Sequence, residues 1–172
     1  MFLSRLWLML SVWCVSIVLA CGLWGLPAQA EIHTYPETET QTMYRSRLSL
    51  RDDQGLAWQT ILFKRVRDGQ VMDFKLRLVG FPGQVAVAHP VDAVLHQGMN
   101  DVWSATDETE GDGQLSTVVS SVGQYDMFGV MRSLDRSAPM TLDVTLEGEE
   151  RRSLVVPPYV VKEWLALKAF PN

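Results

Sequence analysis

The sequence predicts an α+β protein with a single domain, built on a curved antiparallel β-sheet that has a meander core and is open or barrel-like. One or two helices are expected to cover this sheet. Three observations support the prediction. Apolar and polar residues alternate over 43–51 and 71–79, which is typical of half-buried strands. The turn sequences DDQG and RDGQ separate the strand-like segments, and Asp-Gly is a strong hairpin signal. A helical pattern follows Pro158, a residue tolerated in the first turn of a helix.

The chain begins with a segment typical of exported proteins. Arg5 is the only charged residue of 1–30, and an apolar run from Leu6 to Leu26 follows it. Pro27 ends this run, and Ala28-Gln29-Ala30 supplies the small residues that a signal peptidase requires. We therefore predict a signal peptide over 1–30 with cleavage after Ala30.

Two alternatives remain open for this front end. The apolar run is long enough to span a hydrocarbon core of about 30 Å as an uncleaved anchor. Alternatively, Val18-Leu19-Ala20-Cys21 is similar to a lipobox, in which Cys21 would be lipidated. All three interpretations place the domain across a membrane from the cytosol.

The rest of the chain is expected to form an extended arm over 31–42 and one domain over 43–172. Strands over 43–51, 56–66 and 71–79 would form the meander. In the third strand Met72, Phe74, Leu76 and Leu78 would share the buried face. Two or three short strands are expected over 84–107, and two more over 140–157.

Two helices are predicted. Tyr125, Phe128, Met131 and Leu134 are spaced three apart, which indicates one face of a short amphipathic helix over 123–136. The second helix would cover 158–170. In it, the residues expected to dock on the sheet are Val160, Trp164 and Leu167.

Basic residues gather in the meander, although the whole chain has a net charge of −5. The outward face of the meander would carry Arg45, Arg47, Arg51, Lys75 and Arg77. Lys64, Arg65 and Arg67 would lie near one turn, and the acidic residues concentrate elsewhere, in 107–112 and 147–150. This asymmetry predicts a docking surface for an acidic partner, although a solvated sheet face has the same appearance. The acidic balance of the chain argues against nucleic acid as the partner.

His89, Asp92 and His96 are the candidates for a metal site. On a helix their spacing would bring them to one face, as metal ligation requires. The segment reads more readily as a strand, which would distribute them over two faces. The chain offers no obvious fourth ligand, so we expect neither a metal nor another cofactor.

No catalytic signature is present. The sequence has no G-x-S-x-G motif and no phosphate-binding glycine pattern, and the acidic run at 107–112 does not fit a calcium-binding loop. Both cysteines, Cys14 and Cys21, lie in the front end, which excludes thiol chemistry from the predicted domain. We expect a non-enzymatic interaction protein. A carrier of a small apolar ligand or lipid on the concave face of the sheet is the alternative, and a hydrolase that uses His89 or His96 is the weakest interpretation.

Long segments of the chain resemble a known family. They are MYRSRLSLRDDQGLAWQTILFKR, LRLVGFPG followed by AHP, and the closing VPPYVVKEW. In these segments the chain is similar to a small cyanobacterial family described as domain of unknown function 3122. The resemblance implies an exported protein of the periplasm or thylakoid lumen, and with it a membrane-associated photosynthetic complex as partner. It implies no activity and no catalytic residues.

Overall fold

The computed structural model describes residues 32–113, 115 and 120–170. The predicted signal peptide, its cleavage site at Ala30 and the alternative lipidation site Cys21 lie outside these residues. The described residues form nine strands and two helices. In chain order these are β1 (His33–Pro36), β2 (Gln41–Arg51), β3 (Ala57–Arg67), β4 (Gln70–Val79), β5 (Ala93–Gln97), β6 (Asp101–Ala105), β7 (Val122–Asp126), α2 (Phe128–Ser133), β8 (Met140–Thr145), β9 (Arg151–Val156) and α3 (Pro158–Ala169).

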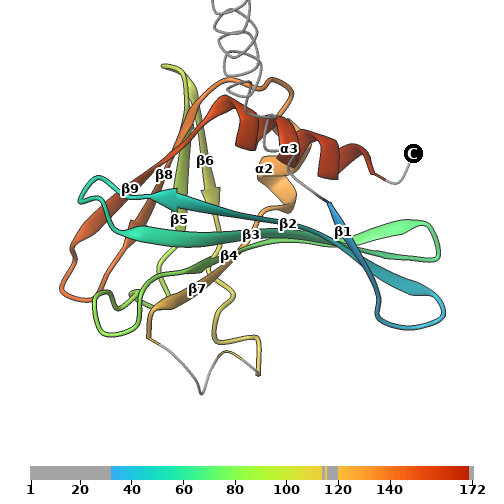
Figure 1. The fold of residues 1–172 in the computed structure, drawn as a ribbon, viewed down its shortest axis with the longest axis horizontal. Helices are drawn as coiled ribbons and strands as arrows, with labels where there is room; N and C mark the ends of the chain where they lie inside the picture. Colours follow the sequence, from blue (N-terminus) through green and yellow to red (C-terminus); the bar gives the residue numbers. More distant parts are fainter. Residues whose placement is uncertain (1–31, 114, 116–119, 171–172) are drawn as a thin grey trace, which may run out of the picture.

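The strands form two antiparallel sheets rather than the single sheet predicted. One has the order β1-β2-β3-β4-β7 and the other the order β6-β5-β8-β9. Isolated bridges connect the sheets at two corners, between Asp52 and Leu154 and between Asp107 and Tyr125. The sheets are not closed into a barrel. In Figure 1 the β1–β2 and β3–β4 hairpins project beyond the four-stranded sheet.

The meander of β2, β3 and β4 confirms the alternation read from the sequence. Phe74, Leu76 and Leu78 are buried on the inner face of β4. Met72, predicted to share that face, is instead 49% exposed, because the register of β3 and β4 shifts at a β-bulge opposite it. At the β3–β4 turn Asp68 and Gly69 both have positive φ, at 50° and 78°, as a type I′ hairpin turn requires. The short hairpin fixes the register, which pairs Leu62 with Leu76.

The core lies between the inner faces of the two sheets and α3, which packs against β2 and β3. Val160, Trp164 and Leu167 are buried on one side of α3, as predicted. The core also includes the following fully buried side chains of both sheets: Trp58, Leu62, Leu76, Leu78, Leu95, Leu142 and Leu154. Neither helix within the described residues is long and apolar enough to cross a membrane.

The structure corrects two predicted elements. The arm over 31–42 is extended, but His33–Pro36 pairs with β2 as an edge strand, and β2 already begins at Gln41. The predicted helix over 123–136 is confined to α2, because Tyr125 belongs to β7 and pairs with Leu76 of β4. The three-residue spacing there combined a strand and a helix into one pattern.

Candidate functional site

The face of the five-stranded sheet opposite α3 is the surface that the sequence analysis singled out, and we call it the outward face. Arg45 and Lys75 both lie opposite Phe63, and Arg47 and Arg77 both lie opposite Ile61, across β2, β3 and β4. Residues in register across neighbouring strands point to the same side of a sheet. The predicted side chains of Arg45, Arg47, Arg51, Lys75 and Arg77 therefore share one face.

Phe63 forms a small apolar centre on this outward face. It is only 4% exposed, because basic side chains cover its ring. The guanidinium carbon of Arg65 lies 5.0 Å from the ring centroid and that of Arg77 lies 5.7 Å from it. Both distances are in the range of cation–π contacts.

Lys64, which the sequence analysis placed near one turn with Arg65 and Arg67, points to the inner side of the sheet. It pairs with Tyr44 and Phe74 on the inner side of the sheet and is 2% exposed. Its ammonium donates hydrogen bonds to the carbonyl oxygens of Lys168, at 3.0 Å, and of Phe170. Burial lowers the pKa of Lys64. This lysine satisfies carbonyl groups at the C-terminal end of α3, where a cation is favourable.

The acidic segment 107–112 lies against the basic face instead of apart from it. Lys75 Nζ lies 2.9 Å from Glu108 Oε2, and Arg77 Nη2 lies 3.1 Å from Asp112 Oδ2. Arg77 also donates to Gln124 Oε1 at 2.7 Å. Burial lowers the pKa of Arg77, and the nearby Asp112 opposes this shift. The β4 half of the outward face is therefore balanced by the protein's own carboxylates.

The arginines on the β2 half of the outward face are not paired with carboxylates of the described residues. Arg45 lies 4.4 Å over the Tyr35 ring and donates to its hydroxyl at 2.5 Å. Arg51 donates to the Gly55 carbonyl at 2.7 Å. The Arg47 side chain is exposed and makes no hydrogen bond or ion pair with the described residues. We call Arg45, Arg47 and Arg51 the arginine row. Each lies beyond ion-pair distance of the described carboxylates.

The structure does not bring the three metal candidates together. His89 Nδ1 lies 2.6 Å from Asp107 Oδ2, and its Nε2 lies 3.0 Å from the Val122 carbonyl oxygen. Asp92 accepts hydrogen bonds from Ser104 and from the Asp107 backbone. His96 is on β5, and its Nε2 lies 3.5 Å from Asp143 Oδ2.

The arrangement around His89 resembles a structural network more than a catalytic one. Across the described residues no group of three potential ligands is placed to hold a metal ion. Nε2 of His89 faces a backbone carbonyl, whereas a hydrolase would present this nitrogen to a nucleophile. Burial would raise the pKa of Asp107, but hydrogen bonds from Thr109, His89 and the Val91 backbone outweigh it and lower the pKa.

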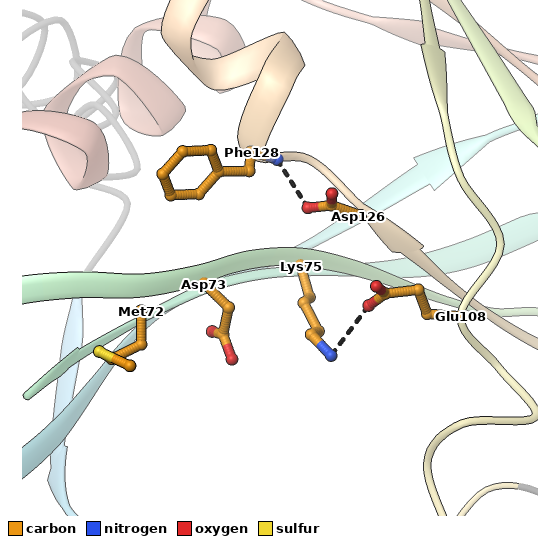
Figure 2. Close-up of a pocket in the computed structure, with 6 residues that line it drawn as sticks. All are labelled: Met72, Asp73, Lys75, Glu108, Asp126 and Phe128. Atoms are coloured by element: carbon orange, nitrogen blue, oxygen red, sulfur yellow. Dashed lines mark hydrogen bonds and ion pairs between the residues drawn. The ribbon is translucent and has the colours of Figure 1, made fainter.

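A groove at the edge of β4 was not predicted from the sequence. It has a volume of about 390 Å³ and is lined by Met72, Asp73, Lys75, Glu108, Asp126 and Phe128. Figure 2 shows Met72, Asp73 and Lys75 on one side of β4 and the Phe128 ring on the other. We call this hollow the edge groove. A signal for it was the Val71-Met72 pair, in which two apolar neighbours interrupt the alternation next to a β-bulge.

A second hollow of about 190 Å³ adjoins the edge groove and shares Phe128 with it. We call it the apolar notch. It is lined by Val71, Phe74, Phe128, Met131, Arg132 and Lys168. The concave side of the described sheet is filled by core side chains, and the two hollows lie at its edge.

Comparison with known proteins identifies the family of this chain. The chain matches the family described as Protein of unknown function (DUF3122) over residues 30–167, and it belongs to that family. No match was found among curated proteins or among solved structures.

Proposed function

We propose that this member of the DUF3122 family is an exported, non-enzymatic accessory protein that docks on an acidic, membrane-associated protein through the arginine row. The front end of the sequence, with Arg5, the apolar run and Ala28-Gln29-Ala30, supports export. The resemblance to cyanobacterial sequences favours the periplasm or the thylakoid lumen, with a photosynthetic complex as the partner.

The observation that carries the docking proposal is the uncompensated charge of β2. Lys75 and Arg77 have carboxylate partners within the protein, so they hold the segment 107–112 in place. Arg45, Arg47 and Arg51 have none within ion-pair distance among the described residues. An acidic partner can therefore meet the arginine row without displacing an internal ion pair, which avoids a cost in free energy.

The position of the arginine row in the sheet also favours docking. β1 pairs with β2 only over Thr42–Arg45, so Arg47 and Arg51 lie on a length of β2 that has no strand neighbour opposite β3 within the described residues. Exposed charges at such a site accelerate association and fix orientation, and they contribute less to affinity. The association should therefore weaken as ionic strength rises, because salt screens exposed charges.

The test is a charge reversal in the full chain, produced with a tag in the cells that make it and isolated in mild detergent. Arg47→Glu with Arg51→Glu should abolish recovery of a stoichiometric acidic partner and leave the melting temperature unchanged. The matched control is Lys162→Glu with Arg151→Glu, which makes the same change in charge at two exposed residues outside the outward face. Equal recovery of the partner with both double variants would contradict the proposal.

A further inference from the structure

The free end of β4 offers a second surface, independent of the arginine row. β7 pairs with β4 over Lys75–Val79 only. The last backbone contact on that side is the hydrogen bond from the Met127 N–H to the Phe74 carbonyl, at 2.9 Å. Among the described strands none pairs with Gln70–Asp73 on the side opposite β3. Unpaired backbone groups at a sheet edge are a template for an added strand.

The two hollows lie along this edge. The edge groove is lined from both sides of β4, by Asp73 and Lys75 on the outward side and by Phe128 on the inner side (Figure 2). A hollow lined from both faces of a strand runs along the strand's edge. The apolar notch continues it on the inner side through Phe74 and Met131.

Acidic residues outnumber basic residues in the lining of the edge groove. Three of its lining residues, Asp73, Glu108 and Asp126, are acidic, and only Lys75 is basic. Lys75 is paired with Glu108. Asp73 Oδ2 forms an ion pair with Arg65 Nη1 at 3.3 Å. The other carboxylate oxygen, Oδ1, is buried and has no hydrogen-bond partner among the described residues. Asp126 accepts the Phe128 backbone N–H at 2.9 Å. The outward side of the edge is therefore complementary to a cation.

The inner side of the edge is complementary to apolar side chains. Val71 and Phe128 are 40% and 37% exposed, and both line the apolar notch. Met72 lies on the outward side with Asp73 and Lys75 (Figure 2). Side chains of an extended chain alternate between the faces of a sheet. One strand added along β4 would present alternate residues to the acidic outward side and to the apolar inner side.

We propose that Gln70–Phe74 of β4 is a strand-addition site for an extended segment of a partner protein in which basic and apolar residues alternate. Backbone hydrogen bonds to β4 would supply affinity, and the two hollows would supply the choice of side chains. The basic residues of the added segment would point toward Asp73 and Asp126. Its apolar residues would occupy the apolar notch beside Phe128 and Met131.

The probe is a capped peptide of alternating lysine and valine, Lys-Val-Lys-Val-Lys-Val, added to the purified full chain in a non-ionic detergent. Calorimetry measures binding, and hydrogen exchange followed by mass spectrometry locates it. The expected result is saturable binding with slower exchange in the β4 segment 70–74. A peptide with glutamate in place of lysine should bind at least about fivefold more weakly.

Two variants make the test specific. Asp73→Asn with Phe128→Ala should weaken binding of the lysine peptide, whereas Asp135→Asn with Val102→Ala should not. Both control residues are exposed, Asp135 in the loop after α2 and Val102 on β6, and neither lines the two hollows. Absence of binding, or equal binding of the glutamate peptide, would overturn the proposal. Slower exchange over 70–74 that depends on protein concentration without peptide would also overturn it, because the occupant would then be a second copy of this chain.

Discussion

The Lys75 ammonium lies 2.9 Å from the Glu108 carboxylate and connects the outward face of β4 to the segment that follows β6. Both side chains are partly exposed, at 25% and 39%. Pairs with this degree of exposure contribute about 0–1 kcal/mol to folding. The contact therefore orders the acidic segment more than it stabilises the fold.

Replacing Lys75 tests this role. Lys75→Met should accelerate hydrogen exchange over 106–113 and lower the free energy of unfolding by no more than about 1 kcal/mol. Hydrogen exchange with mass spectrometry and urea unfolding measure the two effects, with Lys162→Met as the exposed control. Unchanged exchange over 106–113 would show that the pair does not hold the segment.

Lys64 should be far more sensitive than the exposed lysines. Lys64→Met removes the donor that the Lys168 and Phe170 carbonyl groups accept from. We expect a loss of about 1–3 kcal/mol, which is typical when buried polar groups are left without a partner. Urea unfolding followed by circular dichroism measures it. Lys162→Met should stay within about 0.5 kcal/mol of the original protein, and an equal effect of both changes would refute the assigned role of Lys64.

Glu163 predicts a dependence of stability on pH. Its side chain is buried on α3, and neither carboxylate oxygen has a hydrogen-bond partner among the described residues. Burial raises the pKa of Glu163 above its usual 4.5, partly offset by the nearby Ser46 and His33. The folded state therefore holds this proton more tightly than the unfolded state does. The free energy of unfolding should decrease as the pH rises from 4.5 through the raised pKa.

Glu163→Gln should remove the decrease in the free energy of unfolding with rising pH, because glutamine does not ionise. The variant should match the original protein near pH 4 and exceed it in free energy of unfolding near pH 8. Urea titrations at the two pH values measure this, with the exposed Glu147→Gln as the control. A variant less stable than the original protein near pH 8 would show that the ionised carboxylate is stabilised by a contact.

Two glycines should respond in opposite directions to alanine. A Cβ at Gly123 on β7 would lie 2.6 Å from the Tyr125 hydroxyl and 2.9 Å from two ring carbons. Tyr125 is fully buried and cannot move away, so Gly123→Ala should cost about 1–3 kcal/mol. Gly129 on α2 has open space around the same position. Gly129→Ala should therefore stabilise by up to about 1 kcal/mol, and thermal unfolding of the two variants distinguishes these outcomes.

Local patterns predicted the parts of the fold that depend on neighbours in sequence. The Asp68-Gly69 turn and the alternation in β4 were sufficient for the meander, and Pro158 with its following periodicity was sufficient for α3. The division into two sheets could not be predicted, because it depends on pairings such as Leu95 with Leu142 across a long separation in sequence. Tyr125 was assigned to a helix because a short strand and the helix after it happened to share one spacing.

In the candidate site, too, the features set by neighbours in sequence were predicted, and those set by distant contacts were not. Alternation correctly placed Arg45, Arg47, Arg51, Lys75 and Arg77 on one face. It could not show that Glu108 and Asp112 return to that face, since their position depends on how β6 and β7 meet. The edge groove likewise arises where β4 extends beyond β7, and strand lengths relative to their partners are not encoded locally.

The most direct test of the docking proposal uses Ser49, which is exposed on β2 between Arg47 and Arg51. A photo-reactive benzoylphenylalanine at position 49 of the full chain, activated in the cells that make it, should form one dominant adduct with an acidic protein. The same residue at position 162 should not form that adduct. An adduct from position 162 with none from position 49 would contradict the proposal that the arginine row is the docking surface.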